Sequence, residues 1–444
     1  MSLAARAFPI LSRAASTSAA STGKHKVVVV GAGTGGLTAA NQIYNTLKAQ
    51  GKTLADGDIA IIDAAKTHDY QPGFTIVGGG LADKTKFRRD LDSIIPKQFE
   101  HIHQNVKTFE PGTNQVVLAD GTKVGYEYLV VAPGIELKWS KVKGLPEAIA
   151  NPAQSKVGSV YSYDTVDKAW DLIRDFQPGN GEAVFTQPFG PVKCAGAPQK
   201  VAYLSNSYWK SQGRSDIHST FVTGIGAMFG VPHYAKALNA LRESKGNIDA
   251  KFNSNLVEVK DKVAVFEKVA GDDVGSKYEV PFGLLHVVPP QGAYDFVKNS
   301  AIADAAGFVE VDDFTTQHKK YENVFSLGDA SSLPTSKTAA AISAQAPVLV
   351  HNLLTHLETG KMGSARYDGY TSCPLFTGDN KLLLAEFRYG GELQETFARW
   401  GLNQANPNAF TYYLTKDFFP AAYFAKFVKG EWYGPRTIFP PSYL

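Results

Sequence analysis

The chain has 444 residues, of which 44% are hydrophobic and 20% are charged, and its formal net charge is +3. This length predicts two or three domains, and the composition is that of a folded globular protein. The small net charge, without a basic patch interleaved with aromatics, argues against nucleic acid as a partner, and no apolar run is long enough to span a bilayer.

The N-terminal segment, residues 1–23, contains Arg6 and Arg13 among many Ala, Ser and Thr residues, and the first acidic residue of the chain is Asp56. Such a composition is typical of a mitochondrial transit peptide, whereas a secretory signal would need a longer apolar block. A disordered tail is the alternative. We expect the folded part to begin near residue 24.

Strand and helix patterns alternate along the chain in two regions, separated by a Pro-, Lys- and Gly-rich linker over residues 138–158. Short buried strands are predicted at residues 26–30, 59–62, 115–118, 128–131, 182–186, 221–224, 285–288 and 324–327. Helices are predicted at residues 37–49, 160–176, 199–210, 232–244 and 337–354. This alternation predicts an α/β fold with two Rossmann-like dinucleotide-binding domains, followed by an aromatic-rich C-terminal region.

A glycine-rich turn, Gly-Ala-Gly-Thr-Gly-Gly, joins the first predicted strand to the first helix. Gly31 would permit the tight turn, Gly33 the approach of a pyrophosphate and Gly36 the packing of the helix on the strand. The helix N-terminus would offer free N–H groups to the phosphates. Asp63 ends the second strand, where a carboxylate would accept hydrogen bonds from a ribose. These residues predict a site for NAD or FAD.

Two later motifs decide between the two cofactors. One strand runs into a turn that contains Ala132 and Gly134, and another segment, residues 323–329, ends in Gly-Asp. Together they resemble the second and third signatures of the glutathione-reductase-like flavoproteins, which implies FAD. In that superfamily the acid that matches Asp329 binds the ribityl chain, and the next helix points its N-terminus at the flavin. Lys337, near the start of that helix, could add a cation.

The second region lacks a phosphate-binding turn. Its matching strand, residues 182–186, is followed by a loop that contains Pro188 and Pro191 and no GxGxxG pattern. Because proline lacks an N–H group, this loop would cradle a phosphate poorly. The pattern indicates that the second domain keeps the fold without a dinucleotide and that NADH is not the electron donor. A type II NADH:quinone dehydrogenase is the alternative.

Only two cysteines occur, Cys194 and Cys373, and they lie far apart in the sequence. Cys194 follows Lys193 and precedes a predicted helix, and both a cation and a helix N-terminus lower the pKa of a thiol. Cys373 precedes Pro374 in an expected loop. The alternative is two inert, buried thiols, and the spacing by itself does not bring the pair together.

A closer resemblance, to the sulfide:quinone oxidoreductases of the mitochondrial type, is carried by residues 68–73, 191–200, 333–341 and 367–375. The resemblance extends from about residue 24 to the C-terminus. It implies that Cys194 and Cys373 are catalytic, and it adds Gln71 and Val106 to the FAD-binding residues. It also implies hydrogen sulfide and ubiquinone as substrates, and glutathione or sulfite as the small acceptor of the sulfur.

The same resemblance implies a reaction order. Cys194 and Cys373 would be joined in the resting enzyme by a disulfide or through an extra bridging sulfur. Hydrosulfide would attack the sulfur of Cys373 and leave a persulfide there, and the released Cys194 sulfur would pass two electrons to the flavin and on to ubiquinone. The physics of the residues alone does not assign the two roles.

The C-terminal region is rich in aromatic residues, with ten in the 24 positions of residues 410–433 and lysines between them. An aromatic surface with lysines suits a membrane interface, and an aromatic core or a dimer interface is the alternative. Together with the resemblance, this predicts peripheral contact with the mitochondrial inner membrane. The histidines, His101 and His103 among them, are scattered and predict no metal site.

The expected domain organisation combines these parts. It consists of a transit peptide over residues 1–23, a first part of the FAD-binding domain over 24–150, a second Rossmann-like domain over 151–284, a second part of the FAD-binding domain over 285–365, and a quinone- and membrane-contacting region over 366–444. The return of the chain to its first domain follows the flavoprotein resemblance.

Overall fold

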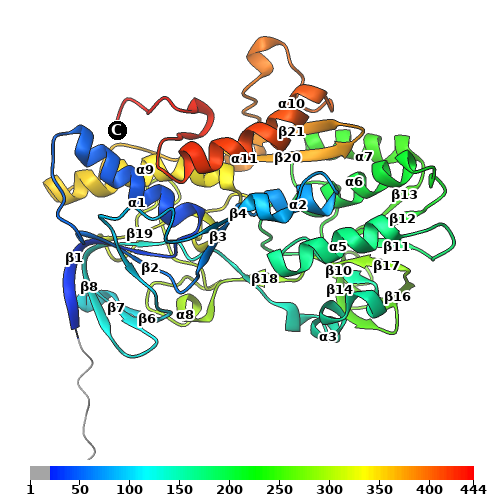
Figure 1. The fold of residues 1–444 in the computed structure, drawn as a ribbon, viewed down its shortest axis with the longest axis horizontal. Coiled ribbons are helices and arrows are strands. Elements are labelled where there is room, and N and C mark those ends of the chain that lie inside the picture. The colour runs from blue at the N-terminus through cyan, green and yellow to red at the C-terminus, as the bar shows by residue number, and fades with distance from the viewer. Residues whose placement is uncertain (1–20) are drawn as a thin grey trace, which may run out of the picture.

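The first α/β unit is built on a seven-stranded sheet, and the computed structural model describes residues 21–444 (Figure 1). The strands run in the order β5, β2, β1, β8, β7, β6, and β19 also pairs with β8. Their bounds are β1 (Ser21–Val30), β2 (Ile59–Ile62), β5 (Glu100–Ile102), β6 (Val106–Glu110), β7 (Gln115–Leu118), β8 (Lys123–Val131) and β19 (Val324–Ser326). Apart from residues 21–23, which begin β1, the predicted transit peptide lies outside the described residues.

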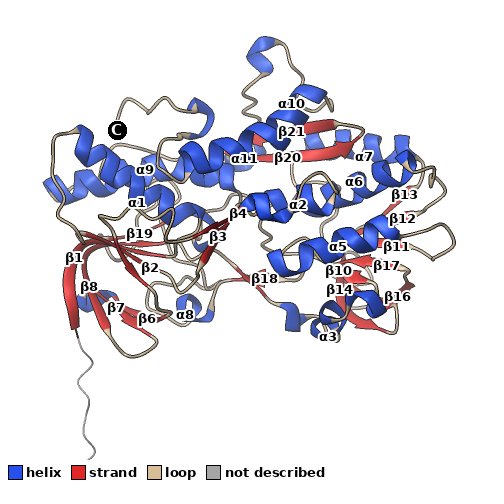
Figure 2. Cartoon of the chain, viewed as in Figure 1, coloured by secondary structure: helices blue, strands red, loops and turns tan. Residues whose placement is uncertain are grey.

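The central strand β1 is buried on both faces, and its residues Val27–Val30 are at most 2% exposed. Next to it, β8 pairs in parallel with β1 along one edge and with two further strands along the other edge. Its first half pairs antiparallel with β7, and its last residues pair in parallel with β19. Through β19 the chain returns to the first unit after building the second one. Helices α1 (Thr34–Ala49) and α9 (Ala339–Thr359) pack together over this sheet (Figure 2).

The second α/β unit contains a parallel five-stranded sheet in the order β10, β17, β11, β12, β13. The bounds of these strands are β10 (Val157–Gly158), β17 (Leu284–His286), β11 (Ala183–Gln187), β12 (Ser219–Thr223) and β13 (Ile248–Lys251), and the main helices of this unit are α5 (Tyr163–Asp175), α6 (Ala197–Ser211) and α7 (Pro232–Lys245). An antiparallel sheet is added by β14 (Ser254–Lys260), β15 (Val263–Lys268) and β16 (Lys277–Pro281). The prediction of an α/β fold with Rossmann-like sheets is confirmed; the second sheet is wholly parallel, and the first is parallel except for its pairings with β7.

Two crossing segments connect the units. The outgoing segment contains β9 (Glu136–Leu137), which pairs antiparallel with β18 (Gln291–Gly292) in the returning segment. The domain boundary expected at residue 285 falls inside β17, whose hydrogen bonds to β10 and β11 complete the second sheet. We therefore place the return to the first unit beyond His286. The remaining short strands and α-helices are β3 (Thr67–Asp69), β4 (Arg88–Asp90), α2 (Gly73–Gly78), α3 (Leu145–Ala150), α4 (Pro152–Ser155) and α8 (Asp295–Lys298).

After α9 the chain forms a hairpin of β20 (Thr371–Gly378) and β21 (Lys381–Phe387), and then a helical segment over residues 409–427 (Figure 1). That segment consists of α10 (Ala409–Tyr413), α11 (Phe419–Ala422) and two π-helical stretches, Leu414–Phe418 and Tyr423–Phe427. Cys373, which we expected in a loop, lies within β20. Within residues 21–444, no helix has both the length and the apolar character needed to cross a bilayer.

Helix α1 carries a row of polar side chains that hold the segment after these helices. The pairs are Thr38 Oγ1 with the Phe427 carbonyl, Asn41 Nδ2 with that of Val428, Asn45 Nδ2 with that of Lys429 and Gln42 Nε2 with that of Trp432, at 2.8–3.3 Å. The acceptors lie at or beyond the end of the last helical turn, where a helix leaves its carbonyls unpaired. The helix that begins at the glycine-rich turn is thereby joined to the C-terminal segment.

Candidate active site

A cavity of about 380 Å³ is lined by residues of both α/β units, of the β20–β21 hairpin and of the C-terminal helices. The predicted site residues that line it are Gly33, Gln71, Ala132, Gly134, Cys194, Asp329 and Lys337. The predicted site residues outside the lining are Gly31, Gly36, Asp63, Val106 and Cys373. Folding therefore gathers at one cavity groups that come from widely separated parts of the chain.

The glycine-rich turn has the geometry that its spacing predicts. Gly31 has a φ of +97°, and a β-carbon there would lie 2.5 Å from the carbonyl oxygen of Ala132. A β-carbon on Gly36 would lie 1.8 Å from the Gly31 oxygen, so only glycine lets α1 start this close to β1. At Gly33 a β-carbon would meet no atom within 4 Å. The open space at Gly33, beside the N-terminus of α1, fits a pyrophosphate.

The Asp63 carboxylate accepts backbone hydrogen bonds, one of them from the glycine-rich turn. Its Oδ2 accepts a hydrogen bond from the backbone N–H of Ala32 at 2.6 Å, and its Oδ1 accepts one from Ala65 at 2.8 Å. An ionised carboxylate has further lone pairs, so these bonds leave room for a ribose hydroxyl. Val106 opens β6, where it pairs with Leu118. The cofactor contacts of Asp63 and Val106 stay predictions.

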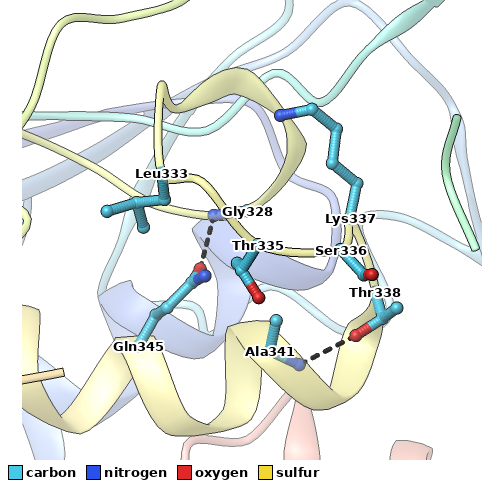
Figure 3. A pocket seen from close by; sticks show the side chains of 8 residues that line it. All are labelled: Gly328, Leu333, Thr335, Ser336, Lys337, Thr338, Ala341 and Gln345. Atoms are coloured by element: carbon cyan, nitrogen blue, oxygen red, sulfur yellow. Dashed lines mark hydrogen bonds between the residues drawn. The ribbon is translucent and has the colours of Figure 1, made fainter. Parts of the chain in front are cut away.

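The start of α9 forms another part of the cavity wall, and a smaller pocket that shares Gly328, Lys337 and Thr338 with it is shown in Figure 3. Thr338 caps this helix, and its Oγ1 accepts a hydrogen bond from the Ala341 N–H at 3.0 Å. Gln345, one turn further on, accepts a hydrogen bond from the Gly328 N–H at 2.8 Å. The second of these bonds holds the Gly-Asp turn against the helix. The positive end of the α9 dipole therefore faces the cavity at Thr338.

Asp329 and Lys337 both line the cavity near the start of α9, where their opposite charges attract each other. Lys337 Nζ donates to the backbone carbonyls of Asp329 at 2.8 Å and of Ser331 at 3.1 Å. Burial raises the pKa of Asp329, and the ammonium groups of Lys337 and Lys193 oppose that rise. Within residues 21–444 no protein donor hydrogen-bonds the Asp329 carboxylate. A carboxylate that lines a cavity without a protein donor fits a hydroxyl-bearing ligand such as the ribityl chain of a flavin.

The two cysteines meet at the cavity wall. Cys194 lies in the loop after β11 with a φ of +54°, a backbone conformation that non-glycine residues rarely adopt. Its N–H donates to the Lys337 carbonyl at 2.8 Å, and its carbonyl accepts from the Ala197 N–H at 2.8 Å. Cys373 is fully buried in β20, which packs against α6. Both cysteines are free thiols in the structure.

The environment separates the pKa values of the two thiols. The hydrogen bond between them lowers the pKa of Cys194 to about 5, and Lys200 and the Gly196 N–H act in the same direction against the effect of burial. For Cys373 the same hydrogen bond, together with burial, raises the pKa well above its ordinary value. These opposite directions favour the thiolate on Cys194 and the thiol on Cys373 in the reduced pair.

The cation beside Cys194 differs from the one that we expected. Lys193 Nζ turns to the side-chain oxygen of Gln71 at 2.7 Å, which joins the two α/β units, and burial lowers the pKa of Lys193 to about 8. Lys200 Nζ instead lies 3.2 Å from Cys194 Sγ. Lys200 belongs to the first turn of α6, which folds back over the cysteine loop. A lysine in the first turn of the predicted helix was the available signal for this contact.

Two of the histidines, His101 and His103, lie close to one carboxylate, that of Asp92. His101 Nδ1 lies 2.8 Å from Asp92 Oδ1, and His103 Nε2 lies 3.3 Å from the same oxygen. Both rings lie on one side of the chain at β5 because alternate residues of a strand share a face. Asp92 and His103 are exposed and His101 is partly buried, and none of the three lines the cavity.

The two α/β units, the glycine-rich turn and the Gly-Asp turn before α9 define a class of flavoprotein. Residues 25–178 match the family model described as pyridine nucleotide-disulphide oxidoreductase. The structure also resembles NDH2 from Plasmodium falciparum, with a TM-score of 0.59 at 12% identity over 95% of this chain and 99% of that one, which shows the shared fold.

Closer relatives define the family. The chain is 44% identical over 437 residues to mitochondrial sulfide:quinone oxidoreductase of Schizosaccharomyces pombe, covering 94% of this chain and 93% of that protein. It is 40% identical over 417 residues to the enzyme of the same name from Mus musculus, covering 93% and 88%. The sulfide:quinone oxidoreductase structure from Aquifex aeolicus matches with a TM-score of 0.75 at 20% identity over 91% and 92% of the two chains. The chain belongs to the sulfide:quinone oxidoreductase family and is an oxidoreductase.

Proposed function

We propose that this enzyme oxidises hydrogen sulfide through Cys194 and Cys373 and delivers the electrons through FAD to ubiquinone. The observation that carries the proposal is the contact between these two thiols, one of which lines the cavity. Nothing in their sequence positions requires that contact. Two thiols with opposite pKa shifts, beside the turn that holds Asp329, have the arrangement that thiol–disulfide chemistry needs.

The cavity residues support FAD as the resident cofactor. Gly33 and the N-terminus of α1 would hold the pyrophosphate, and the Asp329 carboxylate would hold the ribityl hydroxyls. The N-terminus of α9 would face the isoalloxazine ring and favour negative charge on it. FAD, when bound there, supplies a two-electron acceptor that can pass electrons on to a quinone.

The two cysteines divide the sulfur chemistry according to their environments. Starting from a bond between their sulfurs, hydrosulfide attacks the Cys373 sulfur, an S–S bond forms there, and the bond to Cys194 breaks. The leaving group is the Cys194 thiolate, which Lys200 stabilises at 3.2 Å. Transfer of the outer sulfur of the Cys373 persulfide to a small acceptor, glutathione or sulfite, and loss of two electrons to the cofactor restore the bond between the cysteines.

The C-terminal region suits contact with the surface of the mitochondrial inner membrane. Large apolar side chains are exposed along its loops and helices, namely Leu393, Trp400, Phe410, Tyr413, Phe418, Ile438 and Phe439. The segments that carry them lie along one side of the molecule, the upper side in Figure 1. Ubiquinone partitions into the bilayer, so a cavity with aromatic walls beneath these segments would receive it from the membrane.

An anaerobic titration of the flavin-loaded enzyme with sulfide tests this function. Sulfide is expected to bleach the flavin absorbance, and decylubiquinone is expected to restore it. Cys194→Ser and Cys373→Ser should each abolish the bleaching while the flavin remains bound. Bleaching by NADH but not by sulfide, or full activity in either serine variant, would contradict the proposal.

A further inference from the structure

A buried carboxylate that the sulfur chemistry does not use lies on the wall of the cavity. Glu386, in β21, is 4% exposed and lines the cavity together with Tyr370 and Thr396. Among residues 21–444 no lysine, arginine or histidine forms an ion pair with it. Burying a carboxyl group without a partner cation is costly, which marks Glu386 as a candidate functional group.

The β20–β21 hairpin sets Glu386 and Cys373 on opposite faces. Glu386 pairs with Ser372, whereas Cys373 pairs with Ala385, and side chains alternate between the two faces of a strand. The face of Glu386 lines the cavity through Ser372, Pro374, Phe376 and Leu384. The face of Cys373 is turned to Cys194 and is absent from that lining. The hairpin therefore turns Cys373 towards Cys194 and turns Glu386 towards a largely apolar part of the cavity wall.

Four donors hold this carboxylate in place. Oε1 accepts from the hydroxyls of Tyr370 and Thr396, and Oε2 accepts from the Thr396 N–H at 2.8 Å and from Gln404 Nε2 at 2.8 Å. Thr396 and Gln404 belong to the segment between β21 and α10, which bears the exposed Trp400. Through them Glu386 connects the cavity to a segment at the protein surface.

We propose that Glu386 is the proton-exchange group for the quinone, a role that rests on the function proposed above. Reduction of a quinone to its quinol takes two electrons, which the sulfide reaction supplies, and two protons, which must come from water. The Glu386 carboxylate takes up a proton from the solvent side and gives it to a carbonyl oxygen of the quinone as an O–H bond forms there. The carboxylate is regenerated and repeats the cycle for the second proton.

The contacts favour proton exchange at Glu386 rather than at Tyr370 or Glu395. Tyr370 donates to Glu386, and burial raises its pKa well above the ordinary value, so its hydroxyl stays a donor. Glu395, a carboxylate on the same segment as Thr396, accepts a hydrogen bond from Tyr234 at 2.8 Å and does not line the cavity. Glu386 is therefore the only carboxylate besides Asp329 that lines the cavity within the described residues.

Two electron acceptors separate a proton-exchange role from a structural one. With flavin pre-reduced by sulfide, Glu386→Gln is expected to slow reoxidation by decylubiquinone about 100-fold, the usual size of a general acid–base contribution. Reoxidation by ferricyanide, which accepts electrons without protons, should change less than about twofold. The rate of flavin bleaching by sulfide should also be unchanged, and Glu395→Gln should match the wild type with both acceptors.

Two results with the Glu386→Gln variant would overturn the proton-exchange proposal. An equal loss with decylubiquinone and ferricyanide in Glu386→Gln would assign Glu386 a structural role and overturn the proposal. A wild-type rate with decylubiquinone would also overturn it. If Glu386→Gln does not retain flavin, Glu386→Asp, which withdraws the carboxyl group by one methylene, must show the same selective loss with decylubiquinone. Absence of bleaching in the wild type would instead contradict the proposed function.

Discussion

The ammonium nitrogen of Lys200 lies 3.2 Å from the sulfur of Cys194, on the first turn of the helix that follows this cysteine. Lys200 is itself buried, so the pair is poorly screened by solvent. In the proposed reaction this contact would stabilise the Cys194 thiolate that leaves when Cys373 is attacked. The local geometry of α6 would then affect the rate of the first chemical step.

Replacement of this lysine should slow sulfide oxidation. Lys200→Met removes a charge-assisted hydrogen bond worth about 1.5–3 kcal/mol, so flavin reduction by sulfide should slow roughly 10- to 100-fold. The measurement is anaerobic stopped-flow absorbance at neutral pH. Lys210→Met, at the exposed end of the same helix, serves as the control. Equal rates in Lys200→Met and the wild type would contradict a role for this ammonium group.

The reduced enzyme should hold one thiolate down to low pH. Because the pKa of Cys194 is lowered to about 5, its thiolate persists as the pH falls from 9 and is protonated only near pH 5. Thiolate absorbance at 240 nm should therefore titrate near pH 5 in the reduced wild type. Cys373→Ala removes the strongest stabilising contact, so the titration should move to higher pH. Cys194→Ser should lose the low-pH step altogether, and a wild-type titration near pH 9 would refute the assignment.

Two glycines of the same turn should respond differently to alanine. Gly36→Ala places a β-carbon 1.8 Å from the Gly31 oxygen and should lower the melting temperature of the apoprotein. Gly33→Ala meets no protein atom within 4 Å, so the apoprotein should keep its stability while FAD affinity falls. Calorimetry of the apoprotein and flavin fluorescence titration give the two readouts. The interpretation fails if Gly33→Ala retains wild-type flavin affinity.

The contacts of α1 should stabilise the C-terminal segment. Asn41 donates to the carbonyls of Leu37 and Val428 from a buried position, so Asn41→Leu should loosen this segment by about 1–3 kcal/mol. Hydrogen exchange of residues 423–432 measures the change. Asn45→Ala, which removes an exposed bond to Lys429, should have a smaller effect. Equal protection in wild type and Asn41→Leu would argue that other contacts hold the segment.

Membrane binding should depend on the exposed C-terminal side chains. Trp400 and Phe439 are each 68% exposed, and Trp400→Ser with Phe439→Ser should reduce cosedimentation with liposomes. Sulfide should still bleach the flavin of this double variant, because the cysteine site is unchanged. Phe189→Ser, at an exposed site in the second α/β unit, is the control. A double variant that binds liposomes as well as the wild type would place the membrane contact elsewhere.

The cofactor motifs could be predicted because they depend on local geometry. Gly31 needs a positive φ and Gly36 a close approach to the preceding strand, and both requirements are visible in a short stretch of sequence. The strand at residues 59–62 was predicted with its observed bounds because its four residues form a continuous buried apolar run. Cys373 was expected in a loop because Pro374 follows it, yet a two-stranded hairpin accommodates proline at this position.

The sequence by itself determined the α/β class, the glycine-rich and Gly-Asp turns and the presence of two candidate redox thiols. Only the tertiary structure decided that these thiols touch, that Lys200 rather than Lys193 faces Cys194, and that Glu386 lines the opposite face of the hairpin. The physical reason is that turns and strand periods are set by neighbouring residues. The pKa of a thiol and the burial of a carboxylate are set by groups that only packing brings within a few ångströms.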